Sequence, residues 1–406
     1  KELMLEYQRE KYKSAKCILR KGDNMKKALM MASVASMIYK FNMDNIEILE
    51  GQGFEVHVAC NFGNENPISK DEINKFMTIL QDKKIQIYDI DCPRSIFKIN
   101  KIIKTYRQLI KIVSENHYDI VHCQSPIGGA ICRWVCKKAR KNGTKVIYTA
   151  HGFHFFKGGP VLNWIFYPVE RFLSRYTDIL ITINEEDYQR ATRFKAKKVV
   201  KIPSVGIDVN KFSNTDIDRN QKKKEFNIPK DSFVILSVGE LSERKNHEVI
   251  IKAISKLKFK NIYYLICGQG EKENYLKNLI KSLNIEDRVI LAGYRNDINE
   301  IVQIANCFAF PSKREGLGLA SVEAMTVGIP IITSNINGIL EYSEDGITGF
   351  AVSPKDINGF AKSIEVLYKN PDLCKKMGEY NRKIALKFDK NKANSIMKSV
   401  YQSIVN

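Results

Sequence analysis

The sequence predicts an α/β fold of two Rossmann-like, doubly wound domains that face each other across a cleft. Short apolar strands alternate with helical patterns along the chain, and the alternation starts again after residue 210. This order is typical of parallel sheets with helices on both faces. The 406 residues are too many for one ordinary core and suit two such domains. Sheets of this kind bind ligands outside the carboxyl ends of their strands, so we expect a site in the cleft.

Each predicted strand is a short run of apolar residues between polar or turn-forming ones. In the first domain the strands cover 28–34, 54–59, 85–90, 120–123, 146–149 and 179–183. In the second they cover 233–238, 263–267, 289–292, 307–310 and 329–333, with helices near 247–257 and 273–284. Residues 354–406 are predicted to be mostly helical.

Composition and charge limit the class of partner. The net charge of +20 favours an anionic partner such as nucleic acid, an acidic membrane surface or a phosphorylated substrate. No module that combines clustered cations with exposed aromatic residues is recognisable, so nucleic acid is not expected. No apolar run approaches the roughly 18 residues of a transmembrane helix. The nine cysteines are scattered without paired zinc spacing, which indicates free cytosolic thiols.

The first residues do not fit the pattern of the first domain. Residues 1–24 are charged and are predicted to be a non-native or disordered extension, with translation starting at Met25. The lysines that follow Met25 precede an apolar run, which also imitates a signal peptide. Because this run continues directly into the first Rossmann-like unit, we favour a cytoplasmic protein that begins at Met25.

The stretch 308–328 organises the predicted site. Its apolar strand ends at Pro311, and Gly316 and Gly318 remove side chains where the backbone turns. Good helix formers follow from Leu319, so the free N–H groups of a helix N-terminus would face this loop. A diphosphate is the kind of ligand that such a loop binds.

Two carboxylates, Glu315 and Glu323, lie on either side of these glycines, where they could accept hydrogen bonds from sugar hydroxyls. The alternative is an ordinary strand–turn–helix with two solvated glutamates. The complete pattern runs from the Pro-Ser pair at 311–312 through the Gly-Leu-Gly-Leu run at 316–319 to the Gly-Ile-Pro run at 328–330. It resembles the donor-site signature of the retaining GT-B-fold glycosyltransferases of family four, which include many enzymes of capsular and exopolysaccharide synthesis.

The resemblance covers nearly the whole chain from about Met25. It implies retention of anomeric configuration, no cofactor and no metal. It also implies an N-terminal acceptor domain at 25–210, a C-terminal nucleotide-sugar donor domain at 211–385, and a last helix at 386–406 that crosses back to pack on the N-terminal domain.

The resemblance also assigns residues to the site. His151 follows a strand, where a lone histidine is more often structural, but related enzymes have a histidine here that contacts the donor sugar. With Glu315 and Lys245 it forms the predicted catalytic set. Glu240 stands where the family has an arginine, and Arg244 is the candidate that replaces this cation. A cation beside the departing diphosphate would stabilise the charge that grows there. The donor-binding candidates are Arg244, Gly268, Tyr294, Arg295, Gly316, Leu317, Gly318, Leu319 and Glu323.

A helix predicted at 95–113 has its apolar residues at helical spacing along one face. Its opposite half carries cations and no acid, which suits either a solvated face or docking on anionic lipid, and both interpretations stay open. The membrane-facing candidates are Lys98, Lys101, Lys104, Arg107 and Lys111.

Together these features predict a glycosyltransferase that is cytoplasmic and peripheral at the inner face of the plasma membrane. It would move a sugar from a nucleoside-diphosphate sugar, with a UDP-sugar as the expected donor, to a glycan or polyprenyl-diphosphate-linked acceptor in surface polysaccharide synthesis. One alternative is a soluble small-molecule acceptor. Another is a dinucleotide-dependent enzyme, but neither 32–36 nor 239–245 has the Gly-x-Gly-x-x-Gly pattern that this class needs.

Overall fold

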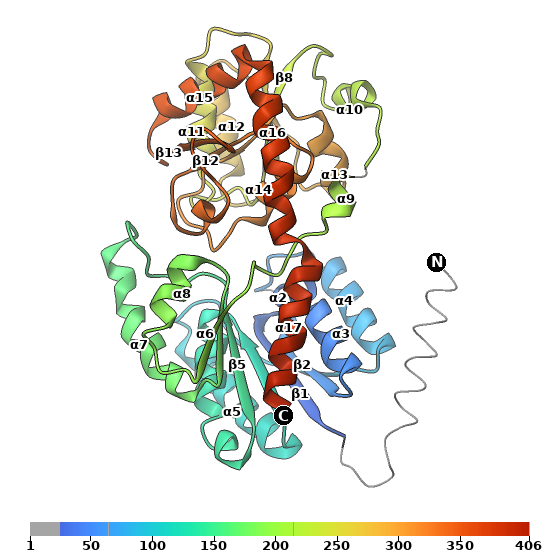
Figure 1. Ribbon diagram of the computed structural model, residues 1–406, viewed down its shortest axis with the longest axis vertical. Helices are drawn as coiled ribbons and strands as arrows, with labels where there is room; N and C mark the ends of the chain where they lie inside the picture. The colour runs from blue at the N-terminus through green and yellow to red at the C-terminus, as the bar shows by residue number, and fades with distance from the viewer. Residues whose placement is uncertain (1–24, 64, 214, 406) are drawn as a thin grey trace.

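The computed structural model describes residues 25–405 except 64 and 214. The predicted extension at 1–24 lies outside the described residues. The described chain forms two α/β bodies that stack along the long axis of the molecule, and the C-terminal helices run from one to the other (Figure 1).

The first sheet has seven described strands, all parallel, in the order β3-β2-β1-β4-β5-β6-β7. Their bounds are β1 Lys27–Val34, β2 Glu55–Asn61, β3 Gln86–Asp89, β4 Ile120–Gln124, β5 Lys145–Ala150, β6 Ile179–Thr182 and β7 Lys198–Lys201. The prediction missed β7, an edge strand whose terminal lysines are exposed, so the sequence shows no apolar run there.

The second sheet has six described strands, also parallel, in the order β10-β9-β8-β11-β12-β13. They are β8 Phe233–Val238, β9 Ile262–Cys267, β10 Val289–Leu291, β11 Cys307–Phe310, β12 Ile331–Ser334 and β13 Gly349–Val352. Here β13 was not predicted, because its four residues are mostly half-buried at the sheet edge.

Helices connect the strands and cover both faces of each sheet. In the first body they are α2 Ala35–Phe41, α3 Met43–Gly51, α4 Lys70–Asp82, α5 Ile99–Asn116, α6 Pro126–Val135, η1 Ala139–Asn142, η2 Val161–Ile165, α7 Phe166–Leu173, η3 Ser174–Tyr176 and α8 Glu185–Ala191. Beyond β7 they are α9 Val209–Ser213, α10 Arg219–Glu225, α11 His247–Ser255, α12 Glu273–Ser282, α13 Ile298–Ile301, η4 Val302–Ile304, α14 Leu319–Thr326, η5 Asn337–Glu341, α15 Ile357–Lys369, α16 Pro371–Ala385, η6 Leu386–Phe388 and α17 Lys390–Val405.

The last helix, α17, returns to the first body and packs beside α3 (Figure 1). Asn394 Nδ2 donates to Asp44 Oδ2 at 2.8 Å, and the Tyr401 hydroxyl meets His122 Nδ1 at 2.8 Å inside the first body. The predicted fold class is therefore confirmed, including the helix that crosses back.

The prediction for α5 needs a correction. Helix α5 begins at Ile99, and only part of the expected apolar face packs on the sheet. Leu109 and Val113 are buried, but Ile99 is 63% exposed and Ile103 is 46% exposed.

Across the described residues, no helix has the length and apolarity needed to cross a bilayer.

Candidate active site

Two loops at the carboxyl ends of adjacent strands form the centre of the site. Strands β8 and β11 are neighbours in the second sheet. The loop after β11 turns at Gly318, where φ is +90°, and this residue caps α14. A side chain at this left-handed position would be strained and would meet the Phe310 ring, so the turn requires glycine. The N–H groups of α14 therefore face the loop that carries Glu315.

Glu315 binds two cations from the loop after β8. Its Oε1 lies 2.7 Å from Lys245 Nζ and 2.6 Å from Arg244 Nη1. The two neighbouring cations thus contact the same carboxylate oxygen. Arg244 also lies near a second acid, with 3.9 Å between its Nη2 and Glu240 Oε2. Burial alone would raise the pKa of Glu315, but the charges of Lys245 and Arg244 lower it below its ordinary value. Burial lowers the pKa of Lys245.

Glu323 lies on the first turns of α14, and its pKa shifts in the opposite direction from that of Glu315. Burial raises the pKa of its carboxyl to about 7, and the charge of Lys211 opposes the shift. The two predicted carboxylates therefore have different charge states near neutral pH: Glu315 is ionised, and Glu323 is partly protonated.

His151 follows β5 in the first body and is held by a buried amide pair. Its Nε2 lies 2.6 Å from Gln124 Oε1. Asn42 Nδ2 donates to the same Gln124 oxygen at 2.9 Å, and the Gln124 amide donates back to Asn42. Because an amide oxygen only accepts, His151 carries its proton on Nε2 and leaves Nδ1 as an acceptor. Burial lowers the pKa of His151 to about 4, so the ring is neutral at physiological pH.

The two bodies touch at the predicted site. A Cβ added at Gly316 would meet the carbonyl oxygen of His151, and one added at Gly152 would lie 2.8 Å from the Cα of Gly316. Asn184 Nδ2, at the start of α8, donates to the Gly316 carbonyl at 2.9 Å. The structure therefore brings His151 and the loop of Glu315 together across the cleft.

The remaining donor-binding candidates lie at the ends of β9, β10 and β11. The N–H of Gly268 donates to the Gly293 carbonyl at 2.7 Å. Leu317 is buried and Leu319 half-buried. Tyr294 is 49% exposed, and its hydroxyl donates to Glu72 Oε1 of α4 at 3.3 Å. Arg295 is bound by Asp297, with Nε to Oδ1 at 2.8 Å, so Tyr294 is the more accessible of the two expected base-stacking residues.

The sequence interpretation did not identify Gln124, Asn42 or Asn184 as site residues. Gln124 ends a buried strand, which is a weak signal of a site residue. The partners of Asn42 and Asn184 are far away in the sequence and only the fold brings them close.

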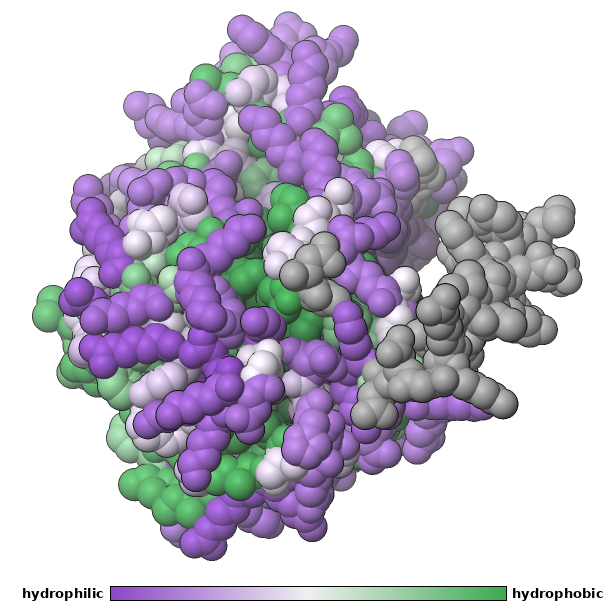
Figure 2. Space-filling view, turned by 60° about the horizontal axis from the view of Figure 1, so that its bottom comes forward, coloured by the Kyte–Doolittle hydropathy of each residue, from purple (hydrophilic) through white to green (hydrophobic). Residues whose placement is uncertain are grey.

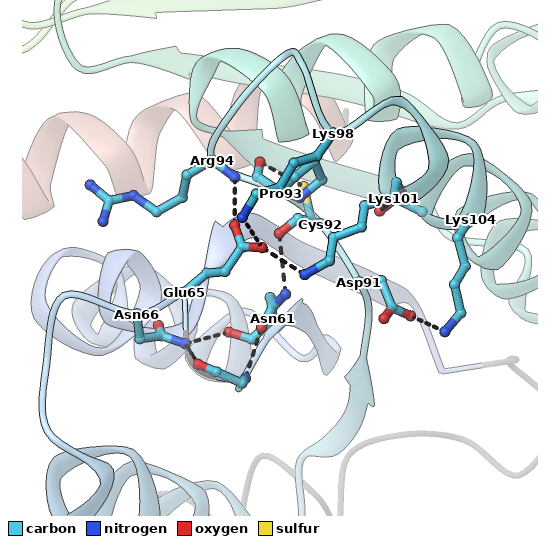
Figure 3. Close-up of polar contacts among 12 residues, drawn as sticks. Asn61, Glu65, Asn66, Asp91, Cys92, Pro93, Arg94, Lys98, Lys101 and Lys104 are labelled. Carbon is cyan, nitrogen blue, oxygen red and sulfur yellow. Dashed lines mark hydrogen bonds and ion pairs between the residues drawn. The ribbon is translucent and has the colours of Figure 1, made fainter.

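The membrane-facing candidates lie away from this site. Lys98 and Lys101 bind Glu65 Oε1 at 2.8 and 2.7 Å, and Lys104 binds Asp91 Oδ2 at 3.0 Å (Figure 3). Hydrogen bonds from Lys101 and Lys98 lower the pKa of Glu65 to about 2. The helix itself carries no acid, as its sequence shows, but acids from neighbouring segments pair with these three lysines, while Arg107 and Lys111 are exposed.

No group of three or more histidine, cysteine, aspartate or glutamate side chains in the described residues is arranged to hold a metal ion. The sequence contains Asp-x-Asp tripeptides at 89–91 and 216–218. Asp91 pairs with Lys104, and Asp218 caps α10 by accepting from two backbone N–H groups.

Comparisons with known proteins agree with this architecture. Residues 27–184 match the family described as glycosyl transferase 4-like, and residues 218–384 match glycosyl transferases group 1. EpsD of Bacillus subtilis (strain 168), which is named as a glycosyltransferase, is 36% identical over 93% of this chain and 97% of its own. The chain therefore belongs to the GT-B-fold glycosyltransferases of this family, as the resemblance implied. It is an enzyme that uses a nucleotide sugar.

Two further similarities are informative. An Escherichia coli enzyme named UDP-Gal:alpha-D-GlcNAc-diphosphoundecaprenol alpha-1,3-galactosyltransferase is 28% identical over 83% of this chain and 86% of its own. The crystal structure of Anabaena HepE in complex with UDP has a TM-score of 0.76 and 19% identity, and the match covers 93% of this chain and all of that one. The structural match supports the fold.

Proposed function

We propose that the protein is a retaining glycosyltransferase that moves a sugar from a UDP-sugar to a polyprenyl-diphosphate-linked acceptor in surface polysaccharide synthesis. The observation that carries this proposal is the convergence of Lys245, Arg244 and Glu315 opposite His151. The Escherichia coli relative, named for a UDP-sugar donor and a lipid-linked acceptor, supports the choice of substrates.

The proposed roles follow from the chemistry of each group. Lys245, Arg244 and the N-terminus of α14 bind the diphosphate and stabilise the charge that it gains as the bond to the sugar breaks. Glu315 and the free Nδ1 of His151 accept hydrogen bonds from the sugar hydroxyls. Tyr294 stacks on the base and Glu323 accepts from the ribose.

In the proposed reaction, the bond between the anomeric carbon and the diphosphate oxygen breaks. The acceptor oxygen then bonds to the same face of that carbon, and its proton moves to the departing diphosphate. The neutral His151 does not need to act as a base. No metal or cofactor has a role in these steps, an expectation that rests on the family resemblance.

We propose the same division of the chain as before: residues 25–210 bind the acceptor, 211–385 bind the donor, and 386–406 join the two. The enzyme would work in the cytoplasm at the inner face of the plasma membrane, where lipid-linked acceptors are available.

Binding and transfer assays test this proposal. Thermal-shift measurements with UDP-, GDP- and ADP-sugars should show stabilisation by a UDP-sugar. That donor should then react with a polyprenyl-diphosphate-linked sugar, and NMR of the product should show the donor's own anomeric configuration. Inversion would contradict the mechanism, and transfer only to a soluble sugar would contradict the acceptor.

A further inference from the structure

Exposed apolar side chains gather on one part of the first body. Val161 of η2 is 86% exposed and Leu162 is 74% exposed. Single exposed apolar residues are normal on soluble proteins, but a contiguous group marks an interaction surface. We call this group the apolar ridge. It consists of Trp134, Val161, Leu162, Trp164, Ile165, Val169 and Phe172.

Three packed elements carry the ridge. The short helix η2 leads directly into α7, and α7 packs against α6, which supplies Trp134. The rings of Trp134 and Phe172 lie 5.9 Å apart, and Tyr176 meets Trp134 edge-on at 5.6 Å. The exposed side chains therefore sit on a fixed surface. Figure 2 shows that hydrophobic side chains also emerge in patches between hydrophilic ones on the face of the molecule that it presents.

The charges beside the ridge are positive. Lys137 Nζ lies 5.2 Å from the centre of the Trp134 ring, and the Arg175 guanidinium lies 5.4 Å from that of Phe172. Lys138, Lys157 and Arg171 are also exposed.

Acidic side chains are nearly absent from the same segments. Glu170 is the one acidic residue in the sequence between 126 and 177. It is buried and bound to Arg133 at 2.9 Å, so it adds no charge to the surface.

We propose that the apolar ridge docks on an anionic lipid bilayer. Tryptophan and tyrosine favour the boundary between lipid and water, and an apolar face edged by cations binds anionic interfaces. Each cation near such a surface contributes about 1 kcal/mol.

The predicted docking surface on α5 fits less well. Phe97 and Ile99 are exposed there, but Glu65 and Asp91 neutralise the nearby lysines (Figure 3).

At the apolar ridge, Glu186 pairs with Arg190, whose guanidinium lies 5.3 Å from the centre of the Trp164 ring. Lys137 and Arg175 form no ion pair with the residues that the structure describes, so the ridge keeps a positive edge.

The position of the ridge also suits the proposed acceptor. The segment from His151 to η2 leaves the carboxyl end of β5, so the ridge is connected to the cleft by ten residues of chain. A bilayer against the ridge would bring a lipid-linked diphosphate to the acceptor side of His151. This last step rests on the proposed function, whereas docking itself does not.

The two tryptophans of the chain, Trp134 and Trp164, both lie on the ridge, so intrinsic tryptophan fluorescence reports on this surface. The full chain is mixed with vesicles of phosphatidylcholine alone or with phosphatidylglycerol. We expect a blue shift and quenching by brominated lipid only with the anionic vesicles. No change with anionic vesicles would overturn the proposal.

Two variants locate the contact. Val161→Ser combined with Leu162→Ser keeps both tryptophans and alters exposed side chains, so its melting temperature should stay the same while vesicle binding falls at least tenfold. The control is Lys98→Gln with Lys101→Gln and Lys104→Gln, which should bind as wild type. Loss of binding in the control, or retained binding in the serine variant, would overturn the assignment.

Transfer assays separate this inference from the proposed function. If the serine variant loses transfer to vesicle-embedded acceptor but keeps wild-type affinity for the UDP-sugar, both are supported. If the wild type docks on vesicles but binds no UDP-sugar, the proposed function fails and the docking surface stands.

Discussion

At the scale of residues, the site depends on a carboxylate that holds two cations in place. Lys245 and Arg244 both bind Glu315 Oε1, so the carboxylate fixes the positions of both cations without a ligand. Lys245 is 12% exposed at its side chain and Arg244 is 36% exposed, which makes Lys245 the more desolvated cation. A less solvated charge, in a region of lower effective dielectric constant, interacts more strongly with a diphosphate.

We expect Lys245→Ala to weaken UDP and UDP-sugar binding alike, by roughly 10-fold to 100-fold, as is usual for a lost hydrogen bond between charged groups. Arg244→Ala should also weaken both, because Glu240 replaces the arginine that the family has next to this loop. Calorimetric titration measures the affinities.

Lys277→Ala is the matched control, because Lys277 pairs with Glu273 on the exposed face of α12. Unchanged UDP affinity in Lys245→Ala would remove this residue from the diphosphate site.

Glu323 gives a pH-dependent prediction. Its pKa of about 7 means that a ligand that binds the ionised carboxylate must displace a proton near neutral pH. The affinity for the UDP-sugar should therefore rise from about pH 6 to about pH 8. Titrations in buffers of different ionisation enthalpy should show proton release, which Glu323→Gln should abolish.

Stability offers an independent check on Glu323. The pKa of Glu323 in the folded protein lies above the ordinary value of 4.5, so the unfolded chain ionises this carboxyl more readily. The free energy of unfolding should therefore fall as pH rises from 4.5 through about 7. The Gln variant should be more stable than wild type at pH 8 by thermal melting. Proton release that persists in the variant would assign the linkage to another group.

At the scale of elements, η5 supports the loop that carries Glu315. The Asn337 side chain accepts from the Glu315 N–H at 3.4 Å. A Cβ at Gly338 would meet the Gly316 carbonyl oxygen and lie 3.0 Å from that of Glu315. Glycine at this position therefore allows η5 to pack directly on the loop backbone.

Gly338→Ala should displace the loop and weaken UDP-sugar binding at least tenfold, although residue 338 carries no group that contacts the donor in our proposal. Gly51→Ala is the control, since a Cβ there meets nothing within 4 Å and Gly51 lies at the exposed end of α3. It should leave binding unchanged and stability equal or slightly higher. Wild-type affinity in Gly338→Ala would show that the loop tolerates the displacement.

At the scale of the whole molecule, α17 joins the end of the chain to the first sheet. Tyr401 is fully buried, and its hydroxyl meets His122 Nδ1, whose other ring nitrogen meets Thr149 Oγ1 at 2.8 Å. Residues 279 positions apart in sequence thus share one hydrogen-bond network, which couples α17 to the first sheet.

Tyr401→Phe should destabilise the protein by about 1–3 kcal/mol, because it leaves the buried His122 nitrogen without its partner. Tyr401→Ala should cost about 3–5 kcal/mol, since it also creates a cavity. Urea unfolding measures both. Equal stability of wild type and Tyr401→Phe would show that the hydrogen bond contributes no net stability.

The architecture follows from patterns that are local in the chain. An apolar run such as 233–238 predicts a strand, and the glycines around Glu315 predict a turn. Both signals lie within a few residues of the element that they predict, so two parallel sheets and the loop that carries Glu315 could be predicted. The short edge strands β7 and β13 could not, because a half-exposed strand of four residues lacks a distinctive pattern.

Long-range packing decided the rest. Whether Lys98 is free depends on Glu65, which lies 33 positions away, and the tautomer of His151 depends on Gln124, 27 positions away. Similarly, apolar residues at helical spacing did not reveal that Ile99 faces solvent or that Phe172 lies beside Trp134. Sequence spacing predicts which residues share one face of a helix or strand. Burial and ion pairing depend on residues that are distant in the sequence and come into contact only in the folded chain.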